Sequence, residues 1–117
     1  MVIHLLSRRW LLLVAALTVA ASGTCLAGGA AAPKATTHTV TIEGSKFDPS
    51  MLTVTAGDTI VWVNKDPFPH TATSKDGTFN SQSIAAGQSW KYTASQKGSV
   101  AYTCTFHPTM RARLRVN

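Results

Sequence analysis

The stretch "SVAYTCTFHPTMRARLRVN" (residues 99–117) closes the chain and contains two alternating segments joined by a short connection. In the first segment, which ends at Cys104, the period of two places the apolar side chains and the thiol on one face of an extended strand. In the second, which begins at Arg111, arginine alternates with alanine, leucine and valine. We therefore predict two neighbouring strands, with Cys104 held at the end of the first.

The segments that precede this stretch show the same period. "HTVTI" (38–42) and "QSWKYTA" (88–94) alternate polar and apolar residues, and "MLTVTAGDTIVWVN" (51–64) contains two β-rich runs broken by the turn signal Ala-Gly-Asp at 56–58. No segment has a helical period. We predict an all-β domain, an antiparallel Greek-key β-sandwich of seven to eight short strands.

The first residues have the features of an export signal. Arg8 and Arg9 form a basic region, an apolar run follows, and a Cys-Leu-Ala cleavage-like site ends at Ala27. A retained anchor would need about 20 apolar residues, so we expect no membrane span after cleavage and a periplasmic protein, exported by the general secretory or the twin-arginine route. The predicted organisation is a signal peptide over 1–27, a flexible tether over 28–36 and one β-sandwich domain over 37–117.

Removal of the signal leaves nine Lys and Arg residues against five Asp and Glu residues, a net charge of +4. Nucleic-acid binding usually shows as a clustered basic face, and this mild, scattered charge does not support it. Cys104 would then be the one cysteine in an oxidising compartment, so no internal disulfide can form. Its thiol could form an intermolecular disulfide, act as a reactive group or bind a metal. We expect the protein to be a monomer.

Cys104, His107 and Met110 all lie in the connection between the two predicted strands. A strand advances about 3.3 Å per residue, so their side chains can converge only if the chain turns tightly, and Pro108 favours such a turn. His70, at the end of the loop "NKDPFPH", could add a second imidazole. Taken one at a time, the cysteine could simply be buried, the methionine could fill the core and the histidines could lie on the surface. Taken together, the four residues indicate a metal-binding site.

The softness of these donors favours copper. Thiolate and thioether suit Cu(I), imidazole suits Cu(II) as well, and two histidines with one cysteine and a weak axial methionine form the blue-copper set. Zinc would more often recruit a second cysteine, a third histidine or a carboxylate, and the Cys-x-x-Cys-His motif of haem attachment is absent from the sequence. We predict one copper ion per chain, cycling between Cu(I) and Cu(II).

With these residues the chain resembles the cupredoxin, or blue copper, family over residues 38–117. The Cys-x2-His-x2-Met spacing that starts at Cys104 is similar to the short ligand loop of amicyanins, whereas plastocyanin and pseudoazurin have longer loops. Further matches are "KFDPSMLTV" (46–54), "AGDTIVWVN" (56–64) and the Pro-His pair that ends at His70.

The resemblance implies a role for each residue of the set. His70, Cys104 and His107 would be the equatorial copper ligands, and Met110 would be the axial one. The backbone N–H of Thr71 would point at the Cys104 sulfur. Many relatives have asparagine at the position of Thr71, with a side chain that ties the two ligand loops together.

Such a site, with no position open for a substrate, favours a one-electron carrier between redox partners. The alternative is a copper carrier or chaperone on the same fold, whose site should be exposed and rich in methionine; Met51 and Met110 are the two methionines left after cleavage. An enzyme of this fold would need a second copper centre with further histidines, and His38 alone is spare. We expect His38 to be solvated and the protein not to be an enzyme.

Two groups of surface residues bear on the partner. Arg111, Arg113 and Arg115 share one face of the final strand beside the ligand loop, which suggests a partner with an acidic surface, such as a c-type cytochrome or a dehydrogenase. Such charges also commonly keep an edge strand soluble. Phe68 and Phe106 flank the ligand loops, where they would either form an apolar docking patch or plug the loop bases.

Overall fold

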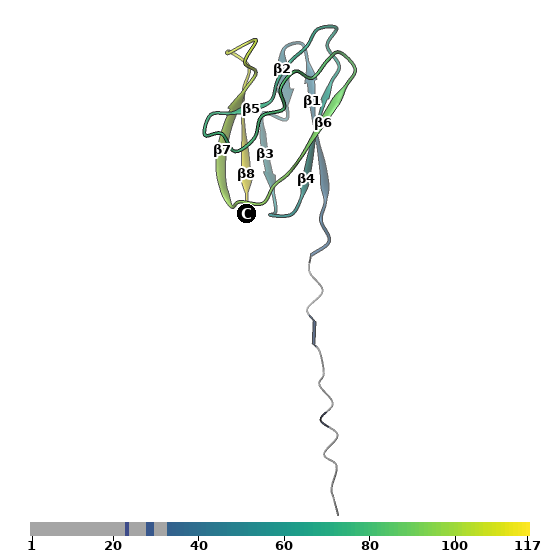
Figure 1. Cartoon of the computed structure of the whole chain (residues 1–117), viewed down its shortest axis with the longest axis vertical. Coiled ribbons are helices and arrows are strands. Elements are labelled where there is room, and N and C mark those ends of the chain that lie inside the picture. Colours follow the sequence, from purple (N-terminus) through teal and green to yellow (C-terminus); the bar gives the residue numbers. More distant parts are fainter. Residues whose placement is uncertain (1–22, 24–27, 30–32) are drawn as a thin grey trace, which may run out of the picture. The chain divides into compact units, whose positions relative to one another are not determined.

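Figure 1 shows the computed structural model of the chain, which describes residues 23, 28–29 and 33–117. The predicted signal peptide lies outside the described residues except for residue 23, and the predicted tether is described only in part. The described residues form eight strands. They contain no helix long and apolar enough to cross a membrane. The prediction of an all-β domain of seven to eight strands is confirmed.

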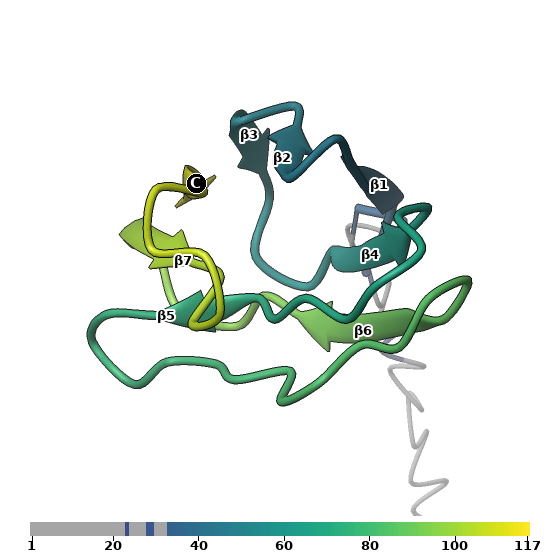
Figure 2. The ribbon, with the colours of Figure 1, turned by 90° about the horizontal axis from the view of Figure 1, so that it is seen from above.

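The strands form two four-stranded sheets that enclose a common core. Figure 2 shows the two groups of strands from above, on opposite sides of the domain. The first sheet has the order β2-β1-β4-β6 and the second the order β3-β8-β7-β5. The strands are β1 (Thr37–Glu43), β2 (Lys46–Asp48), β3 (Met51–Val54), β4 (Thr59–Asn64), β5 (Thr73–Ser74), β6 (Ser89–Thr93), β7 (Gly98–Thr103) and β8 (Arg111–Val116).

The prediction that the sandwich is antiparallel is wrong, because both sheets are mixed. β1 pairs with β4 in parallel, and β3 pairs with β8 in parallel. The chain leaves the first sheet after β2, contributes β3 to the second sheet and returns, so that β4 lies beside β1 and runs in the same direction. Alternation along a strand specifies which face is buried but not the direction of the neighbouring strand.

Side chains from both sheets fill the core. Trp62 of β4 is fully buried, and its ring lies 5.5 Å from that of Trp90 on β6 and 5.6 Å from that of Tyr102 on β7, between ring centroids. The alternation predicted for β8 is confirmed, since its three apolar side chains are buried and its three arginines are exposed. This packing fixes the end of β4, from which the His70 loop leaves, and the end of β7 and the start of β8, which the loop 104–110 connects.

Asp58, in the turn between β3 and β4, ties the start of the first sheet to that turn. Its carboxylate accepts hydrogen bonds from the backbone N–H of Thr36 at 2.9 Å and of Thr55 at 3.0 Å, and lies 2.9 Å from Nε2 of His38. These bonds, led by the one from Thr36, lower the pKa of Asp58 to about 2. His38 is therefore not the freely solvated residue that we expected; its side chain is 25% exposed and paired with Asp58.

The substitution Asp58→Asn should destabilise the fold in a pH-dependent manner. The pKa of Asp58 is about 2 in the folded chain against a reference value of 3.8, so the carboxylate stabilises the fold above pH 3.8 and this contribution is lost as the pH falls towards about 2. The variant should have a lower denaturation midpoint than the wild type at neutral pH, and the difference should shrink below pH 3.8. Urea titrations across this range test it; a difference that does not change with pH would contradict it.

Candidate metal centre

The connection between β7 and β8, residues 104–110, is a tight turn closed by backbone hydrogen bonds. The N–H of His107 donates to the carbonyl of Cys104 at 3.3 Å, and the N–H of Met110 donates to the carbonyl of His107 at 2.8 Å. The N–H of Cys104 donates to the carbonyl of Met110 at 3.2 Å, which joins the two ends of the loop. The tight turn predicted from the spacing and from Pro108 is confirmed.

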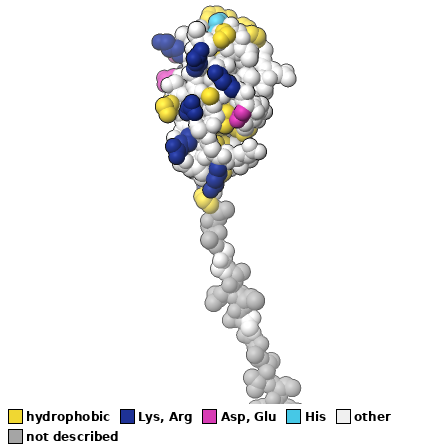
Figure 3. All heavy atoms as spheres, turned by 90° about the vertical axis from the view of Figure 1, so that its left-hand side faces the viewer, with side chains coloured by type: hydrophobic (Ala, Val, Ile, Leu, Met, Phe, Trp, Pro, Cys, Tyr) yellow, Lys and Arg dark blue, Asp and Glu magenta, His cyan; other side chains and the backbone are white. Residues whose placement is uncertain are grey.

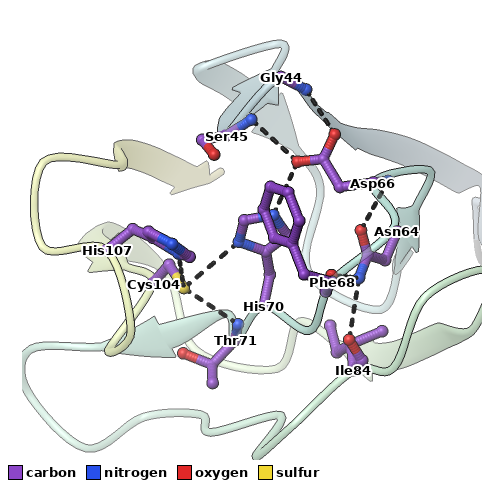
Figure 4. A network of polar contacts seen from close by, with 10 residues as sticks. All are labelled: Gly44, Ser45, Asn64, Asp66, Phe68, His70, Thr71, Ile84, Cys104 and His107. Atoms are coloured by element: carbon purple, nitrogen blue, oxygen red, sulfur yellow. Dashed lines mark hydrogen bonds and ion pairs between the residues drawn. The ribbon is translucent and has the colours of Figure 1, made fainter.

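His70, Cys104 and His107 come together at this end of the sandwich, with their donor atoms within 4.8 Å of one another. Sγ of Cys104 lies 3.6 Å from Nδ1 of His70 and 3.8 Å from Nδ1 of His107, and Figure 4 shows both rings turned towards the sulfur. Cys104 and His70 are fully buried, whereas His107 is partly exposed. One imidazole edge therefore reaches the surface from an otherwise closed cluster.

Two further groups complete the chemical surroundings of the sulfur. The backbone N–H of Thr71 donates to Sγ of Cys104 at 3.3 Å, as the resemblance implied. Met110 is 3% exposed and packs in the core at the end of the ligand loop. A sulfur that receives an N–H bond beside two imidazole nitrogens, with a buried methionine in the same loop, is a donor set that suits copper in both oxidation states.

Thr71 also ties the two ligand loops together through its hydroxyl group. Its Oγ1 accepts a hydrogen bond from the backbone N–H of Thr105 at 2.9 Å and lies 3.1 Å from the hydroxyl of that residue. The hydroxyl of Thr73 donates to the same oxygen at 3.0 Å. A threonine thus links the loops at the position where many relatives have asparagine. Thr105 was not predicted as part of the site, although a hydroxyl residue directly after the predicted ligand Cys104 was a signal for it.

His70 is held on its far side by a polar network that was not predicted from the sequence (Figure 4). Its Nε2 lies 2.7 Å from Oδ2 of Asp66, and the pair is buried. The backbone N–H of Asp66 donates to the Asn64 side chain at 3.0 Å. The amide of Asn64 in turn donates to the carbonyls of Phe68 at 2.8 Å and Ile84 at 3.0 Å. This network fixes the loop that presents His70, and its signal in the sequence was Asn64 and Asp66 in "NKDPFPH".

Removal of the Thr71 hydroxyl should weaken the link between the loops. Thr71→Val keeps the shape of the side chain but removes the acceptor of the Thr105 N–H, so the free energy of unfolding should fall by about 0.5–1.5 kcal/mol. Thr71→Ser, which retains the hydroxyl, is the matched control and should lose much less. Denaturant titrations of both variants measure the difference. A loss in Thr71→Ser as large as that in Thr71→Val would contradict this, because it would show that the methyl group contributes as much as the hydroxyl.

Comparison with known proteins agrees with this geometry. Amicyanin from Paracoccus versutus is 34% identical over 82 residues, which cover 66% of this chain and 62% of that protein. Amicyanin from Paracoccus denitrificans is 29% identical over 82 residues, which cover 66% of this chain and 63% of the relative. The chain therefore spans less than two thirds of the length of these curated relatives.

Solved structures and a family model extend the likeness to the fold. An oxidised amicyanin variant superposes with a TM-score of 0.66 at 28% identity, covering 69% of this chain and 82% of that one. A copper-containing nitrite reductase from Thermus scotoductus SA-01 gives a TM-score of 0.65 at 28% identity, but the match covers 68% of this chain and 22% of the reductase. The model of the cupredoxin-like domain matches residues 10–116. The chain belongs to the cupredoxin-like family, whose cofactor is copper, and it carries an amicyanin-like ligand loop with His70, Cys104 and His107 as its candidate copper site.

Proposed function

We propose that this protein is a one-electron carrier with a single copper centre. Nδ1 of His70, Sγ of Cys104 and Nδ1 of His107 would be the equatorial ligands, and the sulfur of Met110 the weaker axial one. The observation that carries the proposal is the convergence of two imidazole nitrogens and one sulfur within 4.8 Å. Bound copper supplies the ability to gain and lose one electron at a ligand set that both oxidation states accept.

The contribution of the protein is to hold these donors still. Cys104 is placed by the end of β7, and His107 by a loop whose ends are joined through the backbone. His70 is held by hydrogen bonds in both directions between its backbone and that of Ile84, at 3.1 and 2.7 Å. Ligands that cannot move far impose little rearrangement when the charge of the metal changes, which favours rapid electron exchange.

The burial of the donors favours electron transfer over metal delivery. Cys104 and His70 have no exposed surface, and Met110 is 3% exposed. A protein that hands its metal to a receiver needs ligands that the receiver can reach and replace. An electron carrier needs only one edge at the surface, and the partly exposed ring of His107 supplies it.

Within residues 33–117 one group of metal-binding side chains is present, and His38 is paired with Asp58 at the start of the first sheet. The likeness to nitrite reductase covers 22% of that chain, and it does not extend to the rest of that enzyme. We therefore propose a carrier without catalytic activity of its own.

We also propose that the protein acts in the periplasm as a monomer. The basic and apolar pattern of residues 1–27 supports export, followed by cleavage and a short tether before β1. A mature chain whose one cysteine is the buried Cys104 suits an oxidising compartment, because that thiol is shielded from partners with which it could form a disulfide.

The visible spectrum of the copper-loaded protein tests the proposal. A short bond between the Cys104 thiolate and Cu(II) should give an intense charge-transfer band, and a reductant should bleach it reversibly. Cys104→Ser should abolish the band while far-ultraviolet circular dichroism still reports a β-protein, since the core is built without the metal. A wild-type Cu(II) complex without this band would contradict the proposed function.

The proposed docking surface includes an apolar patch around His107. Phe68 is 41% exposed and Phe106 is 52% exposed, so neither is buried as a plug at the base of a loop. The ring of Phe68 lies 5.9 Å from that of His107, between centroids. Exposed aromatic side chains in the two loops that carry His70 and His107 suit contact with a partner protein.

A basic groove lies along β7 and β8. It is lined in part by Lys75, Arg111 and Arg113, and Nε of Arg111 donates to the carbonyl of Pro108 at 3.4 Å, so one cation touches the ligand loop. Figure 3 shows lysine and arginine side chains spread over this side of the domain, with few acidic ones among them. We propose that the redox partner, such as a c-type cytochrome or a dehydrogenase, presents an acidic surface here.

Charge reversal along β8 should slow association with such a partner according to distance from the copper. Arg111→Glu should slow it more than Arg115→Glu, the matched control, which makes the same change of charge about 13 Å farther along the strand. The rate should fall as ionic strength rises, because the Debye length is about 10 Å at 0.1 M. Stopped-flow measurements over a salt series test both points. A rate that is flat in salt would contradict electrostatic steering.

A further inference from the structure

Asp66 lies on the side of His70 that faces away from the sulfur and is not one of the proposed copper ligands (Figure 4). Its Oδ2 is 2.7 Å from Nε2 of His70, while Nδ1 of the same ring faces Cys104. A carboxylate can only accept in this contact, so Nε2 carries the proton. Nδ1 then keeps its lone pair, which is the state that a metal ligand requires.

The turn between β1 and β2 is shaped to receive the same carboxylate. The backbone N–H of Gly44 donates to Oδ1 of Asp66 at 2.7 Å, and that of Ser45 donates to Oδ2 at 2.9 Å. Both residues lie in the left-handed region, with φ of 60° and 55°, which is uncommon for a residue such as serine. Successive N–H groups in a turn of this kind form a concave site for an anion.

The carboxylate is therefore held as an anion in a fixed orientation. Burial by itself would raise the pKa of Asp66, but the hydrogen bonds from Ser45, Gly44 and His70 outweigh it and lower the pKa below its ordinary value. A carboxylate that accepts from the far nitrogen of a metal-binding imidazole orients the ring and makes it a stronger donor.

We propose that Asp66 is a positioning residue that sets the tautomer of His70 and lowers the reduction potential of the copper centre. The electrochemical half of this inference rests on the proposed function, whereas the tautomer can be observed without metal. A negative charge one imidazole ring away from the copper stabilises Cu(II) more than Cu(I), because the oxidised ion carries the larger charge. Loss of that charge should raise the potential.

Asp58 offers a matched control within the same chain. It also accepts two backbone N–H groups and contacts Nε2 of a histidine, His38, at 2.9 Å. Asp58 directly precedes the six-residue strand β4 and Asp66 lies just beyond its other end, so the length of the strand, about 20 Å, separates them. Substitution of either aspartate removes similar contacts, and only Asp66 is placed to affect the metal centre.

The experiment compares Asp66→Asn with Asp58→Asn in the copper-loaded protein and in the metal-free protein. Asp66→Asn should lower the affinity for Cu(II) relative to that for Cu(I) at least tenfold, which raises the reduction potential by about 59 mV for one electron. Asp58→Asn should leave the reduction potential close to that of the wild type. In the metal-free wild type, under conditions where the ring is neutral, nitrogen NMR should show His70 as the Nε2–H tautomer. Asp66→Asn should populate the Nδ1–H tautomer, because an amide can turn its NH₂ group towards the ring.

Equal potentials for the two variants, or a His70 tautomer that the substitution leaves unchanged, would overturn the proposal. If Asp66→Asn does not fold, Asp66→Glu replaces it: the retained charge should keep the Nε2–H tautomer and a potential close to that of the wild type, and loss of either would count against the proposal. A wild-type copper complex without the charge-transfer band would refute the proposed function, while the NMR spectrum of the metal-free protein would still decide the role of Asp66.

Discussion

The hydrogen bond from the N–H of Cys104 to the carbonyl of Met110, at 3.2 Å, is the constraint on which the rest of the site depends. It joins the end of β7 to the start of β8, so that the seven residues from 104 to 110 must form a closed loop. The two strands are paired along their length and packed on the core, which keeps the base of this loop in place. The positions of Cys104 and Met110 thus follow from the sandwich, before any metal is considered.

His70 comes from the other sheet and needs its own supports. It follows β4 in a loop held by the side chain of Asn64, and its ring is fixed between Asp66 and the sulfur of Cys104. The hydroxyl of Thr71 then bridges to the opposite loop. Because each ligand loop is held by its own sheet and by the other loop, the donors converge on a shape that the protein imposes.

The features that could be predicted from the sequence are those with a local signature. Alternation identified the buried faces of β7 and β8, and the spacing of Cys104, His107 and Met110 in one short connection indicated the donor set, because these residues are close in the chain as well as in space. The pairs that could not be predicted join distant residues: Asp58 and His38 are 20 positions apart, and Asp66 and Gly44 are 22 apart. Neither pair leaves a periodic pattern, and the parallel pairing of β1 with β4 depends on a crossover that alternation does not record.

Crystal structures of the copper-loaded protein in both oxidation states would test most directly the claim that the fold pre-forms the site. The anomalous signal of copper should place one ion among Sγ of Cys104 and Nδ1 of His70 and His107, with the sulfur of Met110 as a more distant fourth donor. The account predicts that these side chains keep the same rotamers and hydrogen bonds in the oxidised and reduced forms. Copper bound elsewhere, or a ligand ring that swings away on reduction, would contradict it.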